Sequence, residues 1–120
     1  MVKTPASILI VDDDPGILTA SQMFLKQLFT IVQVETDPGK IPGLLNEQKF
    51  DVILLDMNFT LGKNDGTEGI YWLKRILETD PSATVVFITA FGGVDLAVEA
   101  IKSGAFDFIV KPWKNARLLG

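Results

Sequence analysis

The sequence predicts one α/β domain built on a doubly wound, five-stranded parallel sheet. Short apolar runs recur along the 120 residues, and stretches with helical spacing separate them. The runs are continuous rather than alternating, which is typical of strands covered on both faces. They are residues 8–11, 31–34, 52–55, 85–88 and 108–110. Because right-handed crossovers place the intervening helices on both sides of such a sheet, we expect an open sandwich.

The first two helices differ in the strength of their signals. Asp14 and Pro15 supply an N-cap and a first-turn proline for the first helix. Its expected core face consists of Ile17, Ser21, Phe24, Leu25 and Leu28. Residues 38–47 are a weaker candidate, because two glycines and an internal proline lower their helical propensity.

The later helices have clearer boundaries. Apolar residues at helical spacing predict a helix over residues 70–77 that stops before Asp80, and another over residues 94–101 that Gly104 closes as a C-terminal cap. Residues 114–120 give only the opening of a last helix. We therefore interpret residues 1–120 as a single domain with an incomplete last helix, the N-terminal piece of a longer protein.

Composition narrows the classes of function. Lys and Arg number 11 and Asp and Glu 15, for a net charge of −4, and no basic stripe is present to neutralise phosphates, so we expect no direct nucleic-acid binding. The lack of Cys and His excludes disulfides, imidazole metal sites and Ser-His triads. No apolar run approaches the roughly 20 residues of a membrane span, and no signal-type segment begins the chain. We expect a cytoplasmic protein that does not interact with membranes.

The residues that follow the apolar runs form a candidate site. Asp12 and Asp13 follow the first run, Asp56 the third, Thr89 the fourth and Lys111 the fifth. The functional crevice of an open α/β sheet lies outside the carboxyl ends of its strands. Three carboxylates, one hydroxyl and one ammonium group are therefore expected to converge on one edge of the sheet.

Clustered carboxylates repel one another, and a hard cation with oxygen ligands relieves that repulsion. Mg²⁺ commonly takes one or two carboxylates and a phosphate oxygen, which favours phosphoryl transfer to a carboxylate nucleophile. A single strand-end Asp is more often a turn former or helix cap, and we assign Asp14, which precedes Pro15, to that role. The coincidence of suitable residues at the ends of four strands favours a site for the others.

Four motifs resemble the receiver domains of two-component response regulators. They are the first strand with its acidic pair (8–15, ILIVDDDP), the strand of the phosphoacceptor (52–58, VILLDMN), the threonine motif (87–90, FITA) and the lysine-proline ending (108–112, FIVKP). The match runs from about residue 7 to residue 112. It implies the flavodoxin-like fold of five strands and five helices and a signalling switch rather than an enzyme, with at most self-catalysed phosphorylation and dephosphorylation.

The resemblance also implies the chemistry of the site. Asp56 would accept a phosphoryl group from the phosphohistidine of a sensor histidine kinase. Asp12, Asp13, Asp56 and the backbone carbonyl of Asn58 would hold Mg²⁺, for which Mn²⁺ can substitute. Lys111 would pair with the phosphoryl charge.

A conformational switch is implied by the same resemblance. The Thr89 hydroxyl would turn to the phosphoryl oxygens, and Phe108 would swing into the space that Thr89 leaves. A cis peptide between Lys111 and Pro112 would aim the lysine into the site. Phosphorylation would then shift the population of two conformations, with altered partner binding as the output.

The sequence differs from the usual receiver pattern in two places, and in another it resembles one particular group of receivers. The segment from residue 57 to residue 65 is about two residues longer than the usual family loop, and a chain ending at Gly120 would use the family's usual dimer face poorly. Residues 97–105 resemble the receivers of nitrogen-regulation-type transcription activators. We therefore expect ATPase and DNA-binding output domains in the full-length bacterial protein, control of transcription, and the capacity to form a homodimer.

Three alternatives stay open. A degenerate receiver would act as a phosphorylation-independent interaction module, against which the complete set of acids, Thr89 and Lys111 argues. A haloacid-dehalogenase-type phosphatase also uses a strand-end Asp with Mg²⁺, but it usually has an acid where this chain has Asn58. A flavodoxin-like cofactor carrier lacks support because no phosphate-binding loop follows the first strand.

Overall fold

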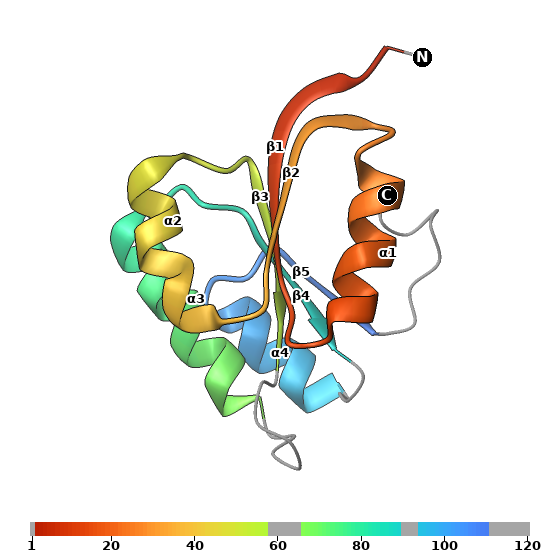
Figure 1. Cartoon of the computed structure of the whole chain (residues 1–120). Helices are drawn as coiled ribbons and strands as arrows, with labels where there is room; N and C mark the ends of the chain where they lie inside the picture. Colours follow the sequence, from red (N-terminus) through yellow and green to blue (C-terminus); the bar gives the residue numbers. More distant parts are fainter. Residues whose placement is uncertain (1, 58–65, 90–93, 111–120) are drawn as a thin grey trace.

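The computed structural model describes residues 2–57, 66–89 and 94–110, which form one five-stranded parallel sheet. The strands are β1 (Thr4–Val11), β2 (Phe29–Glu35), β3 (Val52–Asp56), β4 (Val85–Thr89) and β5 (Asp107–Val110). Their order across the sheet is β2-β1-β3-β4-β5. The predicted doubly wound sheet is confirmed, and Figure 1 shows its strands running through the centre of the molecule.

The first strand is longer than its apolar run indicates. β1 begins at Thr4, whose backbone N–H donates to the Leu28 carbonyl at 2.7 Å, and Thr4 pairs with Phe29 before the register shifts ahead of Ser7. Thr4 and Pro5 at the start of this extension are exposed, so they carry no apolar signal. Backbone pairing with β2, rather than burial, determines where the strand starts.

The first helix, α1 (Pro15–Leu25), begins as the sequence predicts. The Asp14 carboxylate accepts hydrogen bonds from the backbone N–H groups of Gly16 at 2.9 Å and Ile17 at 3.4 Å, which confirms it as the N-cap. The prediction that Leu28 belongs to the helix face is wrong. α1 ends at Leu25, and the Leu28 N–H donates to the Leu25 carbonyl in the turn that leads to β2.

The weak helical signal over residues 38–47 corresponds to two short elements, a 3₁₀ turn (η1, Pro38–Lys40) and α2 (Ile41–Glu47). The next helix, α3 (Thr67–Thr79), ends before Asp80 as expected. α4 (Val94–Lys102) follows β4, and Gly104 lies just beyond it with φ +115°, the left-handed conformation expected of a C-terminal cap.

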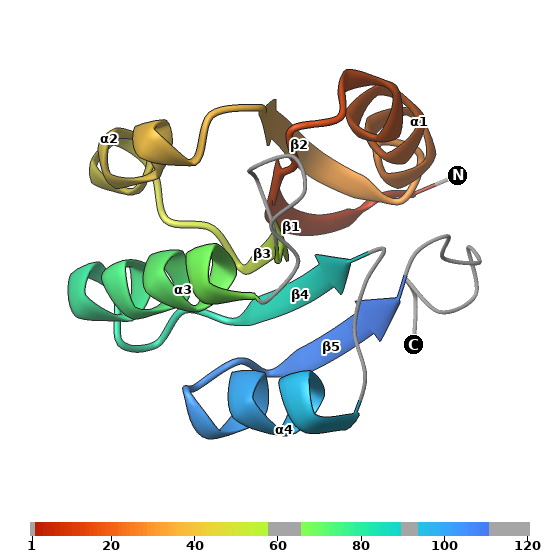
Figure 2. The same ribbon diagram turned by 90° about the horizontal axis from the view of Figure 1, so that it is seen from below.

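The sheet separates two apolar layers. α1 contributes Leu18 and Leu25 to one face, while α2, α3 and α4 cover the other with residues such as Ile41, Leu73 and Ala100. Figure 2 shows α1 and α3 on opposite sides of the sheet. Because both faces of the central strands are buried, their sequences show continuous apolar runs rather than alternation.

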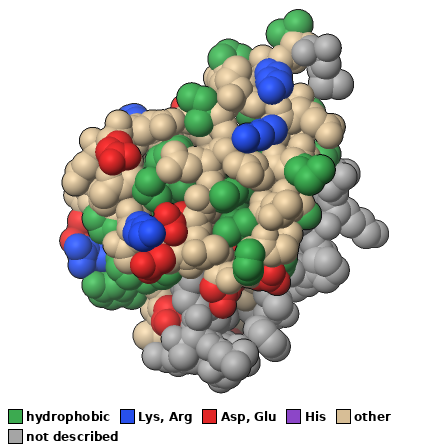
Figure 3. Space-filling model, viewed as in Figure 1, with side chains coloured by type: hydrophobic (Ala, Val, Ile, Leu, Met, Phe, Trp, Pro, Cys, Tyr) green, Lys and Arg blue, Asp and Glu red, His purple; other side chains and the backbone are tan. Residues whose placement is uncertain are grey.

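The described surface carries charges of both signs. On the face shown in Figure 3, Lys and Arg side chains lie in separate places rather than in one stripe. Within the parts of the chain that the structure describes, no helix has the length and apolar character needed to cross a bilayer.

Candidate functional site

The predicted site lies where the strand order reverses. Within the sheet, β2 lies next to β1 on one flank and β3 lies next to β1 on the other. The strand order therefore reverses between β1 and β3. Val11 pairs with Leu55 at the ends of these two strands, and Asp12 and Asp56 are the next residues. Ligand sites of open α/β sheets form outside the strand ends at such a reversal.

Three carboxylates meet at this edge. One oxygen from each of Asp12, Asp13 and Asp56 lies within 4.8 Å of the other two. Asp12 is fully buried, Asp56 is 5% exposed and Asp13 is open to solvent. The Asp12 Oδ1 atom accepts a hydrogen bond from the Asp14 backbone N–H at 2.9 Å, which orients this carboxylate. The sequence prediction that these acids converge is confirmed.

The donor set suits a hard cation. All three groups offer carboxylate oxygens, and like charges at this separation repel one another unless a positive charge lies between them. Because two of these carboxylates are buried and one is exposed, they would hold a cation with protein oxygens and leave room for water ligands. Mg²⁺ takes a similar mixture of carboxylate oxygens and water.

Thr89 stands at the same end of the sheet. It is the last residue of β4, is 1% exposed, and follows Ile88, which pairs with Asp56 in β3. Thr89 thus ends its strand at the edge of the sheet where the carboxylates lie, and its role there stays a prediction. Phe108 lies one strand further along, in β5, where it pairs with Phe87.

The comparison with known protein families decides the identity of the domain. Residues 8–120 match the family model described as the response regulator receiver domain. The chain belongs to this family. This receiver domain therefore consists of the five-stranded parallel sheet with its two apolar layers, and its three carboxylates lie at the point where the strand order reverses.

The curated relatives of this receiver domain include transcriptional regulatory proteins. The transcriptional regulatory protein ZraR of Salmonella typhimurium is 32% identical over 118 residues, which are 98% of this chain and 26% of ZraR. The receiver domain therefore spans about a quarter of the length of such curated relatives. This agrees with the resemblance of residues 97–105 to nitrogen-regulation-type activators.

Solved structures give the same fold. The N-terminal receiver domain of a Bacteroides fragilis response regulator superposes with a TM-score of 0.83 and 43% identity, covering 97% of this chain and 92% of that one. The beryllofluoride-activated NtrC4 receiver domain dimer superposes with a TM-score of 0.81 and 30% identity, covering 94% and 89%.

Several predicted features of the receiver domain lie outside the described residues. They are the Asn58 carbonyl, Lys111, the Lys111–Pro112 peptide, the longer loop and the last helix. Their roles stay predictions. Phe108 is half-buried and packs against the apolar layer that contains Phe87, so its position is described, while its movement stays a prediction.

Sequence reasoning missed how tightly the backbone beyond Asp56 is held. The Met57 carbonyl accepts a hydrogen bond from the Gly69 N–H at 2.9 Å, and the Met57 side chain is fully buried. Gly69 lies in the first turn of α3. The one signal for this contact is a glycine inside an amphipathic helical pattern, which points to a packing reason without saying which partner it packs against.

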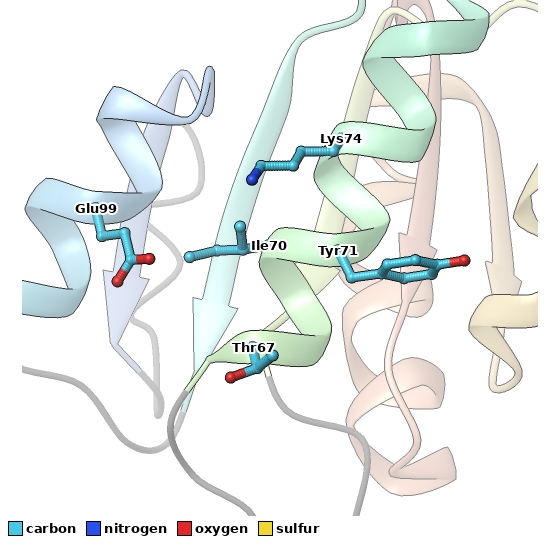
Figure 4. A pocket seen from close by; sticks show the side chains of 5 residues that line it. All are labelled: Thr67, Ile70, Tyr71, Lys74 and Glu99. Atoms are coloured by element: carbon cyan, nitrogen blue, oxygen red, sulfur yellow. The ribbon is translucent and has the colours of Figure 1, made fainter.

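A shallow groove of about 340 Å³ lies between α3 and α4. Figure 4 shows Ile70 and Lys74 of α3 pointing toward α4, with Glu99 on the opposite side. Thr67 lies at the lower end of α3 in this view. The groove contains none of the three carboxylates, so it is separate from the acidic site.

Proposed function

We propose that this receiver domain is a phosphorylation-controlled switch in which Asp56 accepts a phosphoryl group from a sensor histidine kinase. The observation that carries the proposal is the meeting of Asp12, Asp13 and Asp56 where the strand order reverses, with buried Thr89 at the end of the adjacent strand. A lone strand-end aspartate would not need two further acids within 4.8 Å. Such a cluster suits a site that handles a cation and a phosphoryl group together.

The chemical step is a transfer between two nucleophiles. A carboxylate oxygen of Asp56 attacks the phosphorus atom, an O–P bond forms, and the N–P bond of the kinase phosphohistidine breaks, with the electron pair returning to the imidazole. Bound Mg²⁺ supplies positive charge against the phosphoryl oxygens. Asp12 and Asp13 would hold the metal together with Asp56 and the Asn58 carbonyl, and Mn²⁺ would substitute for it.

The burial or exposure of each site residue supports its proposed role. Asp12 is completely enclosed and its Oδ1 atom accepts a hydrogen bond from the Asp14 N–H, so its position is determined by the fold before any ligand binds. Preorganised groups stabilise a developing charge without paying for reorganisation during the reaction. Asp13 faces solvent and leaves the site open to an incoming phosphoryl donor. Lys111 would pair with the transferred charge.

The output is a change of conformation rather than a released product. The Thr89 hydroxyl would bond to the phosphoryl oxygens, and Phe108 would move inward along the same face of the sheet. Contacts available only in the phosphorylated form would then shift the population toward the active conformation. Turnover would be limited to self-catalysed phosphorylation and dephosphorylation.

The relatives suggest what the switch controls. ZraR is a transcriptional regulatory protein about four times as long as the matched segment. We extend this to a cytoplasmic regulator in which ATPase and DNA-binding domains respond to this receiver. The NtrC4 receiver forms a dimer when activated, which supports a phosphorylation-dependent homodimer here.

Intact mass spectrometry after incubation with acetyl phosphate and Mg²⁺ tests the proposal. We expect a gain of one phosphoryl group that disappears in Asp56→Asn and in metal-free samples. Asp95→Asn is the matched control, since Asp95 is exposed on α4 and should leave the gain unchanged. No gain in the unsubstituted chain, with Mg²⁺ binding shown independently, would favour the degenerate receiver and its phosphorylation-independent binding.

A further inference from the structure

The backbone that follows the phosphoacceptor is held from two sides. The Met57 N–H donates to the Ile88 carbonyl in β4 at 3.1 Å, and the Met57 carbonyl accepts from the Gly69 N–H in α3 at 2.9 Å. Because Met57 is bonded directly to Asp56, this pair of hydrogen bonds restrains the phosphoacceptor as well. The start of α3 therefore helps to determine where Asp56 stands relative to the other two carboxylates.

Gly69 makes this approach possible because it has no side chain. A Cβ atom at this position would lie 2.6 Å from the Met57 carbonyl oxygen, 2.8 Å from the Met57 Cα and 3.0 Å from Cε1 of Phe87. Ordinary van der Waals contact begins at 3.4 Å. Two of the three atoms belong to the backbone and cannot rotate away, so any side chain here forces α3 and the Met57 segment apart.

The helix itself gains nothing from this glycine. Glycine in a helix interior is about 1 kcal/mol less favourable than alanine, and Gly69 is buried in the first turn of α3. Gly43 in α2 gives the contrast, because a Cβ there meets nothing within 4 Å. Close contact with the strand end that carries Asp56 is the feature that distinguishes Gly69.

We propose that Gly69 is a positioning residue for the cation site, acting on Asp56 through the Met57 backbone. This deepens the function proposed above and rests on it. Mg²⁺ requires near-ideal octahedral geometry with oxygens at about 2.0–2.1 Å, so a shift of a few tenths of an ångström in one carboxylate weakens binding. Loss of groups that orient metal ligands typically reduces metal affinity by about 10–100-fold.

Titration calorimetry with Mg²⁺ on the unsubstituted chain, Gly69→Ala and Gly43→Ala tests the proposal. The temperature is chosen so that circular dichroism shows all three to be folded. We expect Gly69→Ala to bind Mg²⁺ on the order of tenfold more weakly, and Gly43→Ala to bind it with unchanged affinity. Gly69→Ala that is less stable but binds Mg²⁺ with unchanged affinity would overturn the proposal, since a purely structural glycine behaves in that way.

A second variant covers the case in which Gly69→Ala does not fold. Replacing the amide of Gly69 by an ester, through incorporation of glycolic acid, removes the N–H donor to Met57 without adding an atom that clashes. We expect weaker Mg²⁺ binding here too, and unchanged affinity would overturn the proposal.

The outcomes separate this inference from the proposed function. An unsubstituted chain that binds Mg²⁺ but gains no phosphoryl group contradicts the proposed function, and weaker Mg²⁺ binding by Gly69→Ala still supports the positioning role. If the unsubstituted chain is phosphorylated and Gly69→Ala matches it in Mg²⁺ affinity and phosphorylation rate, only the positioning role is contradicted. An unsubstituted chain that binds no Mg²⁺ overturns both.

Discussion

The side chains of Thr89 and Phe108 lie on the same face of the sheet, on adjacent strands. Phe108 is two residues before the partner of Thr89 in β5. Thr89 pairs with Val110 and Phe87 pairs with Phe108 in the β4–β5 register. Paired residues of a parallel ladder share a face, and residues two apart along a strand share it too. Thr89 is buried and Phe108 is only half-buried, so the aromatic ring still has surface that an inward movement would cover.

This relationship predicts that Thr89→Val separates phosphorylation from the conformational response. Valine preserves the shape of the side chain but removes the hydroxyl, so Asp56 should still gain a phosphoryl group while the Phe108 ring no longer moves. Fluorine NMR of protein labelled at phenylalanine measures the ring environment. The Phe106 signal is the internal reference, since this side chain is 74% exposed. A Phe108 signal that shifts as much in the variant as in the unsubstituted chain would contradict the role of the hydroxyl.

The three clustered carboxylates predict a stability that depends on Mg²⁺. Neutralising exposed Asp13 by Asp13→Asn should raise the free energy of unfolding without metal by on the order of 1 kcal/mol, the repulsion expected at this separation in water-like surroundings. A cation at 100 times its Kd should stabilise the unsubstituted chain by about 2.7 kcal/mol, and Asp13→Asn should lose most of that gain. Urea unfolding with and without Mg²⁺ measures both effects.

Asp95→Asn is the control for that experiment, because it removes one exposed carboxylate outside the cluster. Equal stabilisation of Asp13→Asn and Asp95→Asn by Mg²⁺ would show that the metal acts on the surface as a whole and not at the acidic site.

Much of the site was predictable because the positions of its residues along the sequence, directly after the strands, determine where they lie in the fold. Parallel strands bring their carboxyl ends to one edge, so the positions of Asp12 and Asp56 directly after apolar runs are enough to place them together. The N-cap role of Asp14 is equally local, since its partners are only two and three residues away. Such features depend on sequence neighbours or on the general topology of the sheet.

The features that sequence reasoning missed depend on contacts between distant segments. β1 starts at Thr4 because its backbone pairs with β2, a bond that no side chain signals. The contact of Gly69 with Met57 joins the start of one helix to the end of a strand, and the residue pattern shows the glycine without its partner. Tertiary packing determines both, and hydrophobic periodicity does not report it.

Gly104 provides a stability prediction with a matched control. Its φ of +115° is disfavoured for any residue with a side chain, and a Cβ there would lie 2.6 Å from Cδ1 of Leu77. Gly104→Ala should reduce the free energy of unfolding by about 1–3 kcal/mol. Gly43→Ala should leave it unchanged or raise it by up to about 1 kcal/mol, since its Cβ meets open space. Urea unfolding compares the two, and equal effects would contradict the backbone argument.

Asp80 provides a prediction about pH. The Ser82 hydroxyl donates to its Oδ1 atom at 2.7 Å, and this hydrogen bond is the main reason that the pKa of the Asp80 carboxyl lies below its ordinary value. Burial opposes this shift as the second-largest effect, while the backbone N–H of Ser82 and the charge of Lys49 lower the pKa further. Because the ionised form is favoured in the folded state, the resulting stability is present above the unfolded pKa and is lost as the pH falls through the lowered folded pKa.

Ser82→Ala should therefore raise the pKa of Asp80 toward its ordinary value, because it removes the largest of the effects that lower this pKa. The loss of stability on acidification would then be complete at a higher pH and be smaller in total, since less of it is tied to this carboxyl. Carbon NMR of the Asp80 carboxyl during an acid titration measures the pKa directly. Thr79→Ala is the control, because the Thr79 hydroxyl donates to the Arg75 carbonyl and not to Asp80. If Ser82→Ala and Thr79→Ala leave the Asp80 pKa at the same value, the hydroxyl is not its cause.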